Sequence, residues 1–288
     1  MATTTLTTLP ALPADLDRCV ETALIEDVGA GDLTARLVDE KTEARAVVIS
    51  REAAVLCGQP WFQRVYERID PRVQVTWEVK ESSTTRPDQR VAIVAGPARA
   101  VLTGERTALN FLQLLSATAT ATRRFVERVR GTPVQIVDTR KTVPGLRLLE
   151  KHAVRVGGGV NHRFGLDDGI LIKNTHVALG GGTAAVVARV RAAAPAALRV
   201  QVECRSEREL HDALAAGADA VLLDNRTPEE AAALIDSVAG RVPVELSGGI
   251  TLANVARYAA AGADRISIGA LTHSAPGVPI HLRIETSS

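Results

Sequence analysis

The sequence predicts an α/β protein, in which an incomplete TIM-like α/β barrel of about six parallel strands follows a smaller N-terminal α+β domain. The main observation is a series of short β-rich runs in the second half of the chain, each ending at a polar or glycine residue. These runs are VQIV before Asp138, ILI before Lys173, VQV before Glu203, VLL before Asp224, VEL before Ser247 and ISI before Gly269. Because helical segments separate most of them, the strands are expected to lie parallel and to be joined by right-handed crossovers.

Helix-capping patterns mark the segments between these strands. Ser206 with Glu209 and Thr227 with Glu230 have the spacing of capping boxes, and glycines such as Gly217 suit helix ends. The sequence AAGAD also occurs twice, at residues 215–219 and 260–264. This spacing suits two successive βα units.

Parallel strands of this kind could curve into a barrel or open into a doubly wound sheet. A doubly wound sheet gathers its functional residues at the switch point of the strand order. Here every strand ends at a polar or glycine residue, as expected when a ring of loops converges on one site at the carboxyl ends of barrel strands. The distribution therefore favours the barrel.

The first half of the chain has a different pattern. Helices are expected over residues 14–26 and 98–130, with strands over 45–50, 73–79 and 91–95 between them. The stretch PRVQVTWEV alternates apolar and polar residues, which is typical of a sheet with one covered face. We expect a flexible tail at 1–12, an N-terminal α+β sandwich domain at 13–113 joined by the C-terminal segment 275–288, and the barrel at 114–274.

Composition argues against several classes of function. With 34 basic and 33 acidic side chains the net charge is +1, so no global field favours nucleic acid or an anionic membrane. Only 3% of the residues are aromatic, which argues against base-stacking platforms. Cys19, Cys57 and Cys204 fit neither a disulfide framework nor a CxxC metal site, and we interpret them as packing residues. No signal peptide or membrane-spanning run is evident, so a cytoplasmic protein is expected.

Several cations follow the predicted strands. Arg140 and Lys141 come after the first barrel strand, His162 and Arg163 follow a run of glycines, and Lys173 ends the second strand. A solvated charged surface is the alternative interpretation. However, basic groups at the ends of buried strands do little for stability, and a guanidinium group binds a carboxylate or phosphate through paired hydrogen bonds. The pattern therefore favours a site for a small polyanion.

Two carboxylates, Glu203 and Asp224, end the next two strands. They could neutralise the neighbouring cations as a structural pair. Alternatively, their oxygens could bind a hard metal ion such as Mg²⁺ together with substrate hydroxyl groups. The residues alone leave both alternatives open.

Glycine-rich loops follow the last two strands, in SGGIT at 247–251 and IGALTHS at 268–274. Glycine exposes backbone N–H groups, and barrels often bind phosphate at these loops, so a phosphorylated substrate is expected. His273 could bind phosphate or cap a loop. No pair among His152, His211 and His281 has metal-ligand spacing, so we interpret these histidines as solvent or packing residues, and the spacing test gives no zinc site.

Long motifs carry a resemblance to a known family. The central one is DTRKTVPGLRLLEKHAVRVGGGVNHRFGLDDGILIKNTH, preceded by EDVGAGDLT and GERTALNFLQLLSATATATRRF and followed by LLDN, SGGI and GALTHS. Together they resemble the quinolinate phosphoribosyltransferase family. The resemblance implies that quinolinate and phosphoribosyl pyrophosphate (PRPP) give nicotinate mononucleotide, pyrophosphate and carbon dioxide in NAD synthesis, with Mg²⁺ as the cofactor. It also implies a homodimer or a hexamer built as a trimer of dimers.

The resemblance also implies roles for individual residues. Catalytic roles fall to Lys141, Lys173, Glu203 and Asp224, and the last two would hold the metal, directly or indirectly. Arg106 matches an arginine that one subunit contributes to its neighbour's barrel. The expected quinolinate-binding residues are Arg106, Thr139, Arg140, Lys141, His162, Arg163 and Lys173. The expected PRPP- or phosphate-binding residues are Lys141, Lys173, Glu203, Asp224, Ser247, Gly248, Gly249, Gly269, Ala270, Leu271 and His273, with Thr139 also close to PRPP.

Some positions depart from the family pattern. Asn174 and Thr175 follow Lys173 where an acidic residue and Asn are usual, Cys204 and Arg205 replace an apolar and an acidic residue, and the tail PGVPIHLRI is unusual. One rival interpretation is a molybdenum-transport-associated paralogue with the same fold, against which the retained TRK, HR and Lys173 argue. Another is a non-catalytic phosphate-binding protein.

Overall fold

Two separate β-sheets, one antiparallel and one parallel, organise the computed structural model, which describes residues 9–195 and 197–285. Each sheet belongs to its own compact unit. The first unit combines residues from Met1–Arg123, Thr142–Gly158 and Leu271–Ser288, and the second combines Arg124–Lys141 with Gly159–Ala270. Both units are therefore built from segments that are distant in the sequence.

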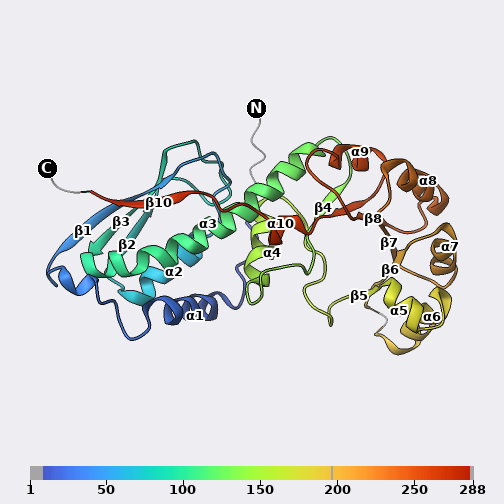
Figure 1. Cartoon of the computed structure of the whole chain (residues 1–288), viewed down its shortest axis with the longest axis horizontal. Coiled ribbons are helices and arrows are strands. Elements are labelled where there is room, and N and C mark those ends of the chain that lie inside the picture. The colour runs from blue at the N-terminus through green and yellow to red at the C-terminus, as the bar shows by residue number, and fades with distance from the viewer. Residues whose placement is uncertain (1–8, 196, 286–288) are drawn as a thin grey trace. The chain divides into compact units, whose positions relative to one another are not determined.

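The first unit has a four-stranded antiparallel sheet with the strand order β10-β1-β3-β2. The strands span Ile280–Ile284 (β10), Glu43–Ser50 (β1), Gln89–Pro97 (β3) and Gln74–Trp77 (β2). The helices are α1 (Leu16–Val28), the short 3-10 helix η1 (Ala35–Leu37), α2 (Gln59–Ile69), α3 (Ala98–Arg128) and α4 (Arg147–Val156). Figure 1 shows α2 and α3 running across one side of this sheet.

The core of the first unit joins this sheet to its helices. Helix α2 starts after Gly58, whose φ of +112° favours glycine, and Pro60 lies in the first turn, where a missing N–H costs no hydrogen bond. Trp61 and Phe62 of α2 are fully buried in the same cluster as Val48 of β1. Burial of such large aromatic side chains provides much of the hydrophobic stabilisation of this unit.

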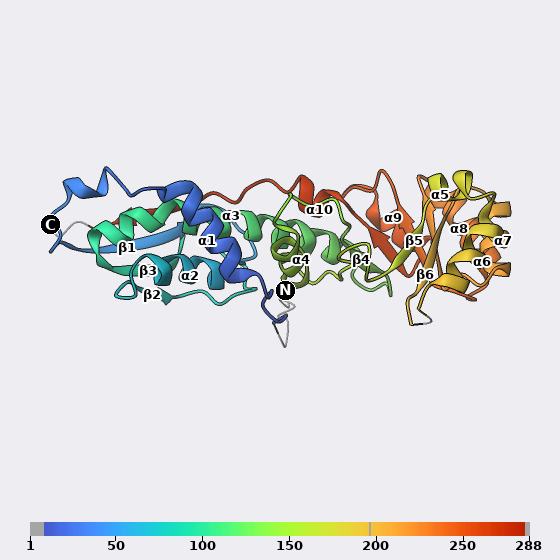
Figure 2. The ribbon, with the colours of Figure 1, turned by 90° about the horizontal axis from the view of Figure 1, so that it is seen from below.

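The second unit has a six-stranded sheet with the order β4-β9-β8-β7-β6-β5, in which every neighbouring pair runs parallel. The strands span Gln135–Val137 (β4), Ile170–Ile172 (β5), Val200–Cys204 (β6), Ala220–Asp224 (β7), Val244–Ser247 (β8) and Arg265–Ser267 (β9). The helices are α5 (Asn174–Leu179), α6 (Thr183–Ala193), α7 (Glu207–Ala215), α8 (Pro228–Val238) and α9 (Val255–Ala260), and α10 (Ala270–His273) spans the unit boundary. In Figures 1 and 2, α6, α7 and α8 lie along the outer side of the sheet.

The parallel sheet confirms the predicted incomplete barrel. All six apolar runs that the sequence marks as strands are strands, and in the described part of the chain β4 and β5 do not pair, so the sheet stays open. The predicted caps are also present: the hydroxyl groups of Ser206 and Thr227 accept hydrogen bonds from the backbone N–H groups of Glu209 and Glu230. Such caps satisfy N–H groups that have no partner within the helix.

The unit boundaries differ from the expected domain ranges. Helix α3 is continuous from Ala98 to Arg128, so the chain passes residue 114 without a break, and the division falls after Arg123. Residues 142–158 and 271–274, expected in the barrel, belong to the first unit, because α4 buries Leu149 and Ala153 in the first unit's core. The C-terminal strand β10 pairs with β1 in the first unit. Of the tail expected at 1–12, residues 1–8 lie outside the described residues.

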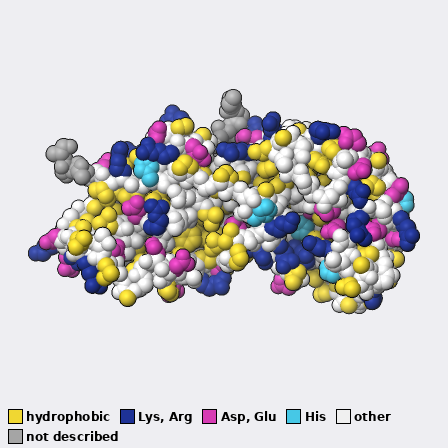
Figure 3. All heavy atoms as spheres, viewed as in Figure 1, with side chains coloured by type: hydrophobic (Ala, Val, Ile, Leu, Met, Phe, Trp, Pro, Cys, Tyr) yellow, Lys and Arg dark blue, Asp and Glu magenta, His cyan; other side chains and the backbone are white. Residues whose placement is uncertain are grey.

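Charge and hydropathy show no large-scale pattern. In Figure 3, acidic and basic side chains are interspersed over most of the visible face, with a dense group of Lys and Arg side chains near its centre. Among the described residues, no helix combines the length and the apolar character that crossing a bilayer would need. Cys19, Cys57 and Cys204 are buried free thiols.

Candidate active site

A pocket in the second unit lies at the carboxyl-terminal ends of the parallel strands. Its cavity has a volume of about 200 Å³. The lining includes side chains from all six strand ends and from the loop between α4 and β5, which carries His162 and Arg163. The lining residues are Thr139, Arg140, Lys141, His162, Arg163, Leu171, Lys173, Glu203, Leu222, Asp224, Glu245, Ser247 and Ser267. The carboxyl ends of the strands form the usual site of catalysis in barrel folds. We therefore take this pocket as the candidate active site.

The two arginines of the pocket lie close enough to affect each other. Burial and the charge of Arg140 lower the pKa of Arg163, and the charge of Asp168 opposes this effect only in part. The Nε atom of Arg140 is buried and has no hydrogen-bond partner among the described residues. An unpaired buried donor costs free energy. A bound anion would remove both costs, because it would accept hydrogen bonds and offset the repulsion between the guanidinium groups.

A buried aspartate holds the loop that carries Arg163. Asp138 follows β4, is fully buried, and accepts hydrogen bonds from the Asn161 side chain (2.6 Å) and the backbone N–H of His162 (2.8 Å). The backbone N–H of Arg163 donates to Nδ1 of His162 at 2.7 Å, and Nη1 of Arg163 donates to the Gly169 carbonyl at 2.9 Å. These bonds orient the arginine while leaving most of its donors available.

Behind His162 lies a buried polar network that the sequence analysis did not identify. Its Nε2 atom is 3.0 Å from Oε1 of Gln201 and 3.5 Å from Oε2 of Glu245, and Gln201 donates to Glu245 at 3.1 Å. Glu245 is 2% exposed, and its Oε1 atom has no partner among the described residues. One signal was present in the sequence. Glu245 lies two residues before Ser247, so a strand places both side chains on the same face.

Both lysines of the pocket are exposed and follow strands. The backbone N–H of Lys141 donates to the Thr139 hydroxyl at 3.0 Å, which fixes the turn after β4. The backbone N–H of Lys173 donates to Nδ1 of His176 at 2.9 Å in the first turn of α5. The unusual sequence after Lys173 thus retains a histidine that orders the backbone at the pocket edge.

The carboxylates Glu203 and Asp224 lie on adjacent strands. Glu203 is opposite Leu222 in the parallel ladder, and Asp224 comes two residues later, so both side chains point to the same face. The Oδ2 atom of Asp224 accepts a hydrogen bond from the Asn225 side chain at 2.8 Å. Both carboxylates line the pocket and offer only oxygen atoms. An oxygen-only donor set fits a hard cation such as Mg²⁺.

The glycine loop after β8 has a steric reason for its first glycine. Gly248 has a φ of +94°, and a Cβ atom there would collide with the side chain and backbone nitrogen of Asn225. The Asn225 backbone N–H in turn donates to the Ser247 carbonyl at 2.8 Å. The ends of β7 and β8 therefore approach each other more closely than any side chain at residue 248 would allow.

Not all the expected site residues line this pocket. Gly248 and Gly249 follow β8, and Gly269 and Ala270 follow β9, so they continue the strand ends without contributing to the lining. Arg106, Leu271 and His273 belong to the first compact unit. Conversely, Leu171, Leu222, Glu245 and Ser267 line the pocket although the sequence analysis did not select them.

Comparison with known proteins places this geometry in one family. Residues 32–116 match the model of the quinolinate phosphoribosyl transferase N-terminal domain, and residues 118–283 match that of the C-terminal domain. The probable nicotinate-nucleotide pyrophosphorylase (carboxylating) of Bacillus subtilis (strain 168) is 37% identical over 264 residues, which is 92% of this chain and 91% of its own. The human nicotinate-nucleotide pyrophosphorylase (carboxylating) is 40% identical over 277 residues, covering 94% of this chain and 92% of the human one.

A solved structure agrees with these sequence matches. The nicotinate-nucleotide pyrophosphorylase from Francisella tularensis superposes with a TM-score of 0.92 at 37% identity, covering 97% of this chain and all of the other. Both domain models, the relatives and the fold thus agree over nearly the whole chain. The chain belongs to the quinolinate phosphoribosyltransferase family.

Proposed function

We propose that this chain transfers the phosphoribosyl group of PRPP to quinolinate and releases pyrophosphate and carbon dioxide, giving nicotinate mononucleotide for NAD synthesis. The observation that carries the proposal is the pair Arg140 and Arg163, whose guanidinium groups share one pocket and repel each other. Quinolinate is a small planar dianion, and its two carboxylates would satisfy both groups through paired hydrogen bonds. The relatives bear the name of this activity.

The cations would bind quinolinate, and the polar network would orient one of the binding residues. Quinolinate would be surrounded by Arg140, Arg163, His162, Thr139 and Lys173. The network of Gln201 and Glu245 behind His162 limits the rotation of its ring. An imidazole of His162 that cannot rotate would hold quinolinate in one orientation, with its pyridine nitrogen directed at the ribosyl carbon. Such positioning lowers the entropic cost of the reaction.

The transfer step breaks one bond and forms another at the ribosyl carbon. The bond from C1′ to the pyrophosphate oxygen breaks, its electron pair leaves with pyrophosphate, and the pyridine nitrogen supplies the pair for the new C1′–N bond. Glu203 and Asp224 would stabilise the positive charge that develops on the ribosyl group, and Lys141 and Lys173 would neutralise the leaving pyrophosphate; all four line the same pocket. The glycine loops after β8 and β9 would bind the 5′-phosphate through backbone N–H groups.

Decarboxylation follows from the charge on the ring. Once the nitrogen is quaternary, it withdraws electrons from the adjacent carbon. The bond to the neighbouring carboxylate then breaks, its electron pair stays on the ring carbon, carbon dioxide leaves, and a proton from solvent takes its place.

A magnesium ion would complete the PRPP site. The oxygen ligands of Glu203 and Asp224 suit it, directly or through water, and a bound Mg²⁺ would neutralise charge on the pyrophosphate group. The proposal also includes assembly in the cytoplasm as a homodimer or a trimer of dimers. In that assembly, Arg106 would add a further cation to the quinolinate site of the neighbouring subunit.

The decisive experiment incubates the purified protein with quinolinate, PRPP and Mg²⁺ and measures nicotinate mononucleotide and carbon dioxide. We expect both products in equal amounts, and neither when nicotinate replaces quinolinate. Tight PRPP binding without turnover would instead favour a phosphate-binding protein. If the folded protein converts neither quinolinate nor nicotinate, the result would favour the molybdenum-associated paralogue and refute the proposal.

A further inference from the structure

A second group of chemically active side chains lies in the first unit. Cys57 comes just before α2, Glu81 follows β2, and His152 lies in α4. One possible ligand atom from each lies within 4.8 Å of the other two. Cys57 is fully buried and His152 is 6% exposed, so this is an interior cluster. Its members come from three distant segments, which is why a search for short ligand spacings could not find it.

The three donor types are those of zinc sites. Thiolate sulfur, imidazole nitrogen and carboxylate oxygen bind Zn²⁺ at roughly 2.0–2.3 Å, which places the ligand atoms of a tetrahedral site about 3.5 Å apart. The present separations, at most 4.8 Å, exceed that value by roughly an ångström, so each donor atom would need to move only about that far for an ion to bind.

Neighbouring groups orient two of the three donors. The Nδ1 atom of His152 lies 3.3 Å from the Ala11 carbonyl, which can only accept, so Nδ1 carries the proton and Nε2 keeps its lone pair. Metal-binding histidines commonly donate their second N–H to such a carbonyl. The Trp61 ring packs edge-on against the imidazole, with ring centroids 5.2 Å apart. Glu81 accepts hydrogen bonds from the backbone N–H groups of Gly58 (2.8 Å) and Gln59 (3.2 Å), which fix its carboxylate.

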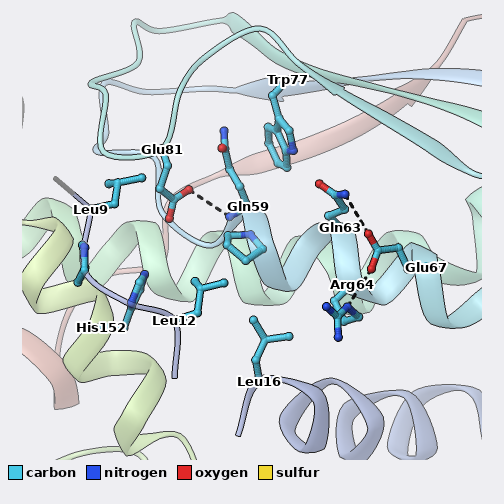
Figure 4. Close-up of a pocket in the computed structure, with 12 residues that line it drawn as sticks. Leu9, Leu12, Leu16, Gln59, Gln63, Arg64, Glu67, Trp77, Glu81 and His152 are labelled. Carbon is cyan, nitrogen blue, oxygen red and sulfur yellow. Dashed lines mark hydrogen bonds and ion pairs between the residues drawn. The ribbon is translucent and has the colours of Figure 1, made fainter. Parts of the chain in front are cut away.

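The cluster also has access to a cavity. Glu81 and His152 line a cavity of about 360 Å³ within the first unit. Figure 4 shows these two side chains at one end of it and Arg64 and Glu67 at the other. The cavity gives an ion a route to two of the three donors, Glu81 and His152, and leaves room for a water molecule as a fourth ligand.

The electrostatics of the cluster suit a dication. Burial raises the pKa of Glu81, and the groups that oppose this effect are backbone N–H groups and the Cys57 thiol, with no cation among the described residues. Burial and the charge of Glu81 hold the pKa of Cys57 well above its usual range, so Cys57 is a thiol in the metal-free protein. A divalent ion would displace the thiol proton and balance the charges of the carboxylate and of the thiolate that forms.

We propose that Cys57, Glu81 and His152 form a zinc-binding site, separate from the site that takes the substrates. The Cys57 sulfur, one Glu81 oxygen and one His152 ring nitrogen bind the ion, and water from the cavity completes a tetrahedron. The thiol proton is released to solvent when the Zn–S bond forms. The ion ties together the start of α2, the loop after β2 and α4, so it stabilises the folded first unit by mass action.

Cobalt(II) provides the test, because a cobalt–thiolate bond has an intense near-ultraviolet charge-transfer band. The full-length protein, stripped of metal and free of an affinity tag, is titrated with Co²⁺ alone. We expect a band that saturates at one equivalent in the wild type and in Cys19→Ala, and that is lost in Cys57→Ala. Absence of the band from the wild type, or an unchanged band in Cys57→Ala, would overturn the proposal.

A second measurement needs no variant. X-ray absorption of the wild type loaded with one equivalent of Zn²⁺ should show one sulfur neighbour together with nitrogen and oxygen neighbours. A shell of nitrogen and oxygen alone would mean that the cluster is only a hydrogen-bonded cap of α2, and would refute the site. Neither measurement contains quinolinate or PRPP, so its outcome is independent of the proposed enzymatic function.

Discussion

Arg163 is the residue on which the proposed recognition of quinolinate depends most directly. It lies beside Arg140 in one pocket, and within the described ranges neither guanidinium group forms an ion pair with a carboxylate. Its Nη1 atom donates to the Gly169 carbonyl, and its remaining N–H groups would be available to a ligand. Such an arrangement costs stability in the free protein and is repaid when an anion binds.

We therefore predict that Arg163→Ala raises the KM for quinolinate by about tenfold to a hundredfold, since a charged hydrogen-bonded contact contributes about 1.5–3 kcal/mol. The KM for PRPP should change much less. Steady-state kinetics with each substrate varied in turn gives both values. Arg208→Ala, which removes an exposed arginine of α7, is the control. An equal loss of affinity for both substrates would contradict the assignment.

Glu150 should make the stability of the first unit depend on pH. It is fully buried in α4, Oε2 accepts a hydrogen bond from the Val143 backbone N–H, and Oε1 has no partner among the described residues. Burial raises the pKa of Glu150 to about 7. The protonated carboxyl group of Glu150 therefore contributes its full stabilisation below the pKa that Glu150 has in the unfolded chain. As the pH rises through about 7, the free energy of unfolding falls by roughly 3 kcal/mol.

Glu150→Gln should remove that loss. Urea unfolding of the variant and the wild type at a series of pH values would show the two free energies of unfolding diverging between about pH 4.5 and 7, with the variant more stable at neutral pH. Glu127→Gln, at an exposed position, should follow the wild type. Parallel curves for Glu150→Gln and the wild type would show that the carboxylate is not the source.

The sequence predicted the charged residues of the pocket better than the residues that support them. Arg140, Lys173, Glu203 and Asp224 could be found because each one ends or follows an apolar run, and strand ends of a parallel sheet converge. Asp138 also ends a run, but its role depends on hydrogen bonds to a loop more than 20 residues away. No local pattern encodes such bonds, so they became visible only in the folded chain.

Among the secondary-structure elements, the parallel strands were the most predictable. Their apolar runs are bounded by clear turn and cap residues, so β4 to β9 were all anticipated. Helix α2 was missed although Trp61, Phe62, Val65 and Tyr66 recur with helical spacing. In the structure Gly58 precedes the helix and Pro60 lies in its first turn, so both residues mark its start.

The close approach of β7 and β8 gives a test at the level of these strands. Gly248→Ala should lower activity at least tenfold, because its Cβ would push Asn225 and the glycine loop out of position. Gly217→Ala is the matched control: its φ of +87° is equally unsuitable for alanine, but nothing lies within 4 Å of the added carbon. It should lose only about 1–2 kcal/mol of stability. Comparable activity of the two folded variants would contradict the proposed role of the loop.

The division of the whole chain into units was harder to predict than its strands. Each unit recruits segments from distant parts of the sequence, and residues 142–158 return to the first unit between two strands of the second. Apolar patterning reports which residues are buried, but not which of two cores receives them. The long-range packing of α4 decides that question.

The proposed assembly predicts complementation between inactive subunits. Arg106→Ala and Lys141→Ala should each be inactive. After mixing and subunit exchange, about a quarter of wild-type activity should return, since half of the dimers are hybrids and each hybrid keeps one intact site. Activity measured before and after exchange checks this. A mixture of Lys141→Ala and Asp224→Ala, which both lie in the second unit of one subunit, should stay inactive. A lack of recovery in the first mixture would argue against a shared site.

The position of β10 determines when the first unit can be completed during synthesis. Strand β1 lies between β3 and β10, and the backbone N–H of Arg51 donates to the carbonyl of Pro279 just before β10. Until residues 280–284 leave the ribosome, one edge of β1 has no partner, and an open edge can pair with another chain. Nascent chains, and chains that lack residues 280–284, should therefore be the ones that need chaperones most.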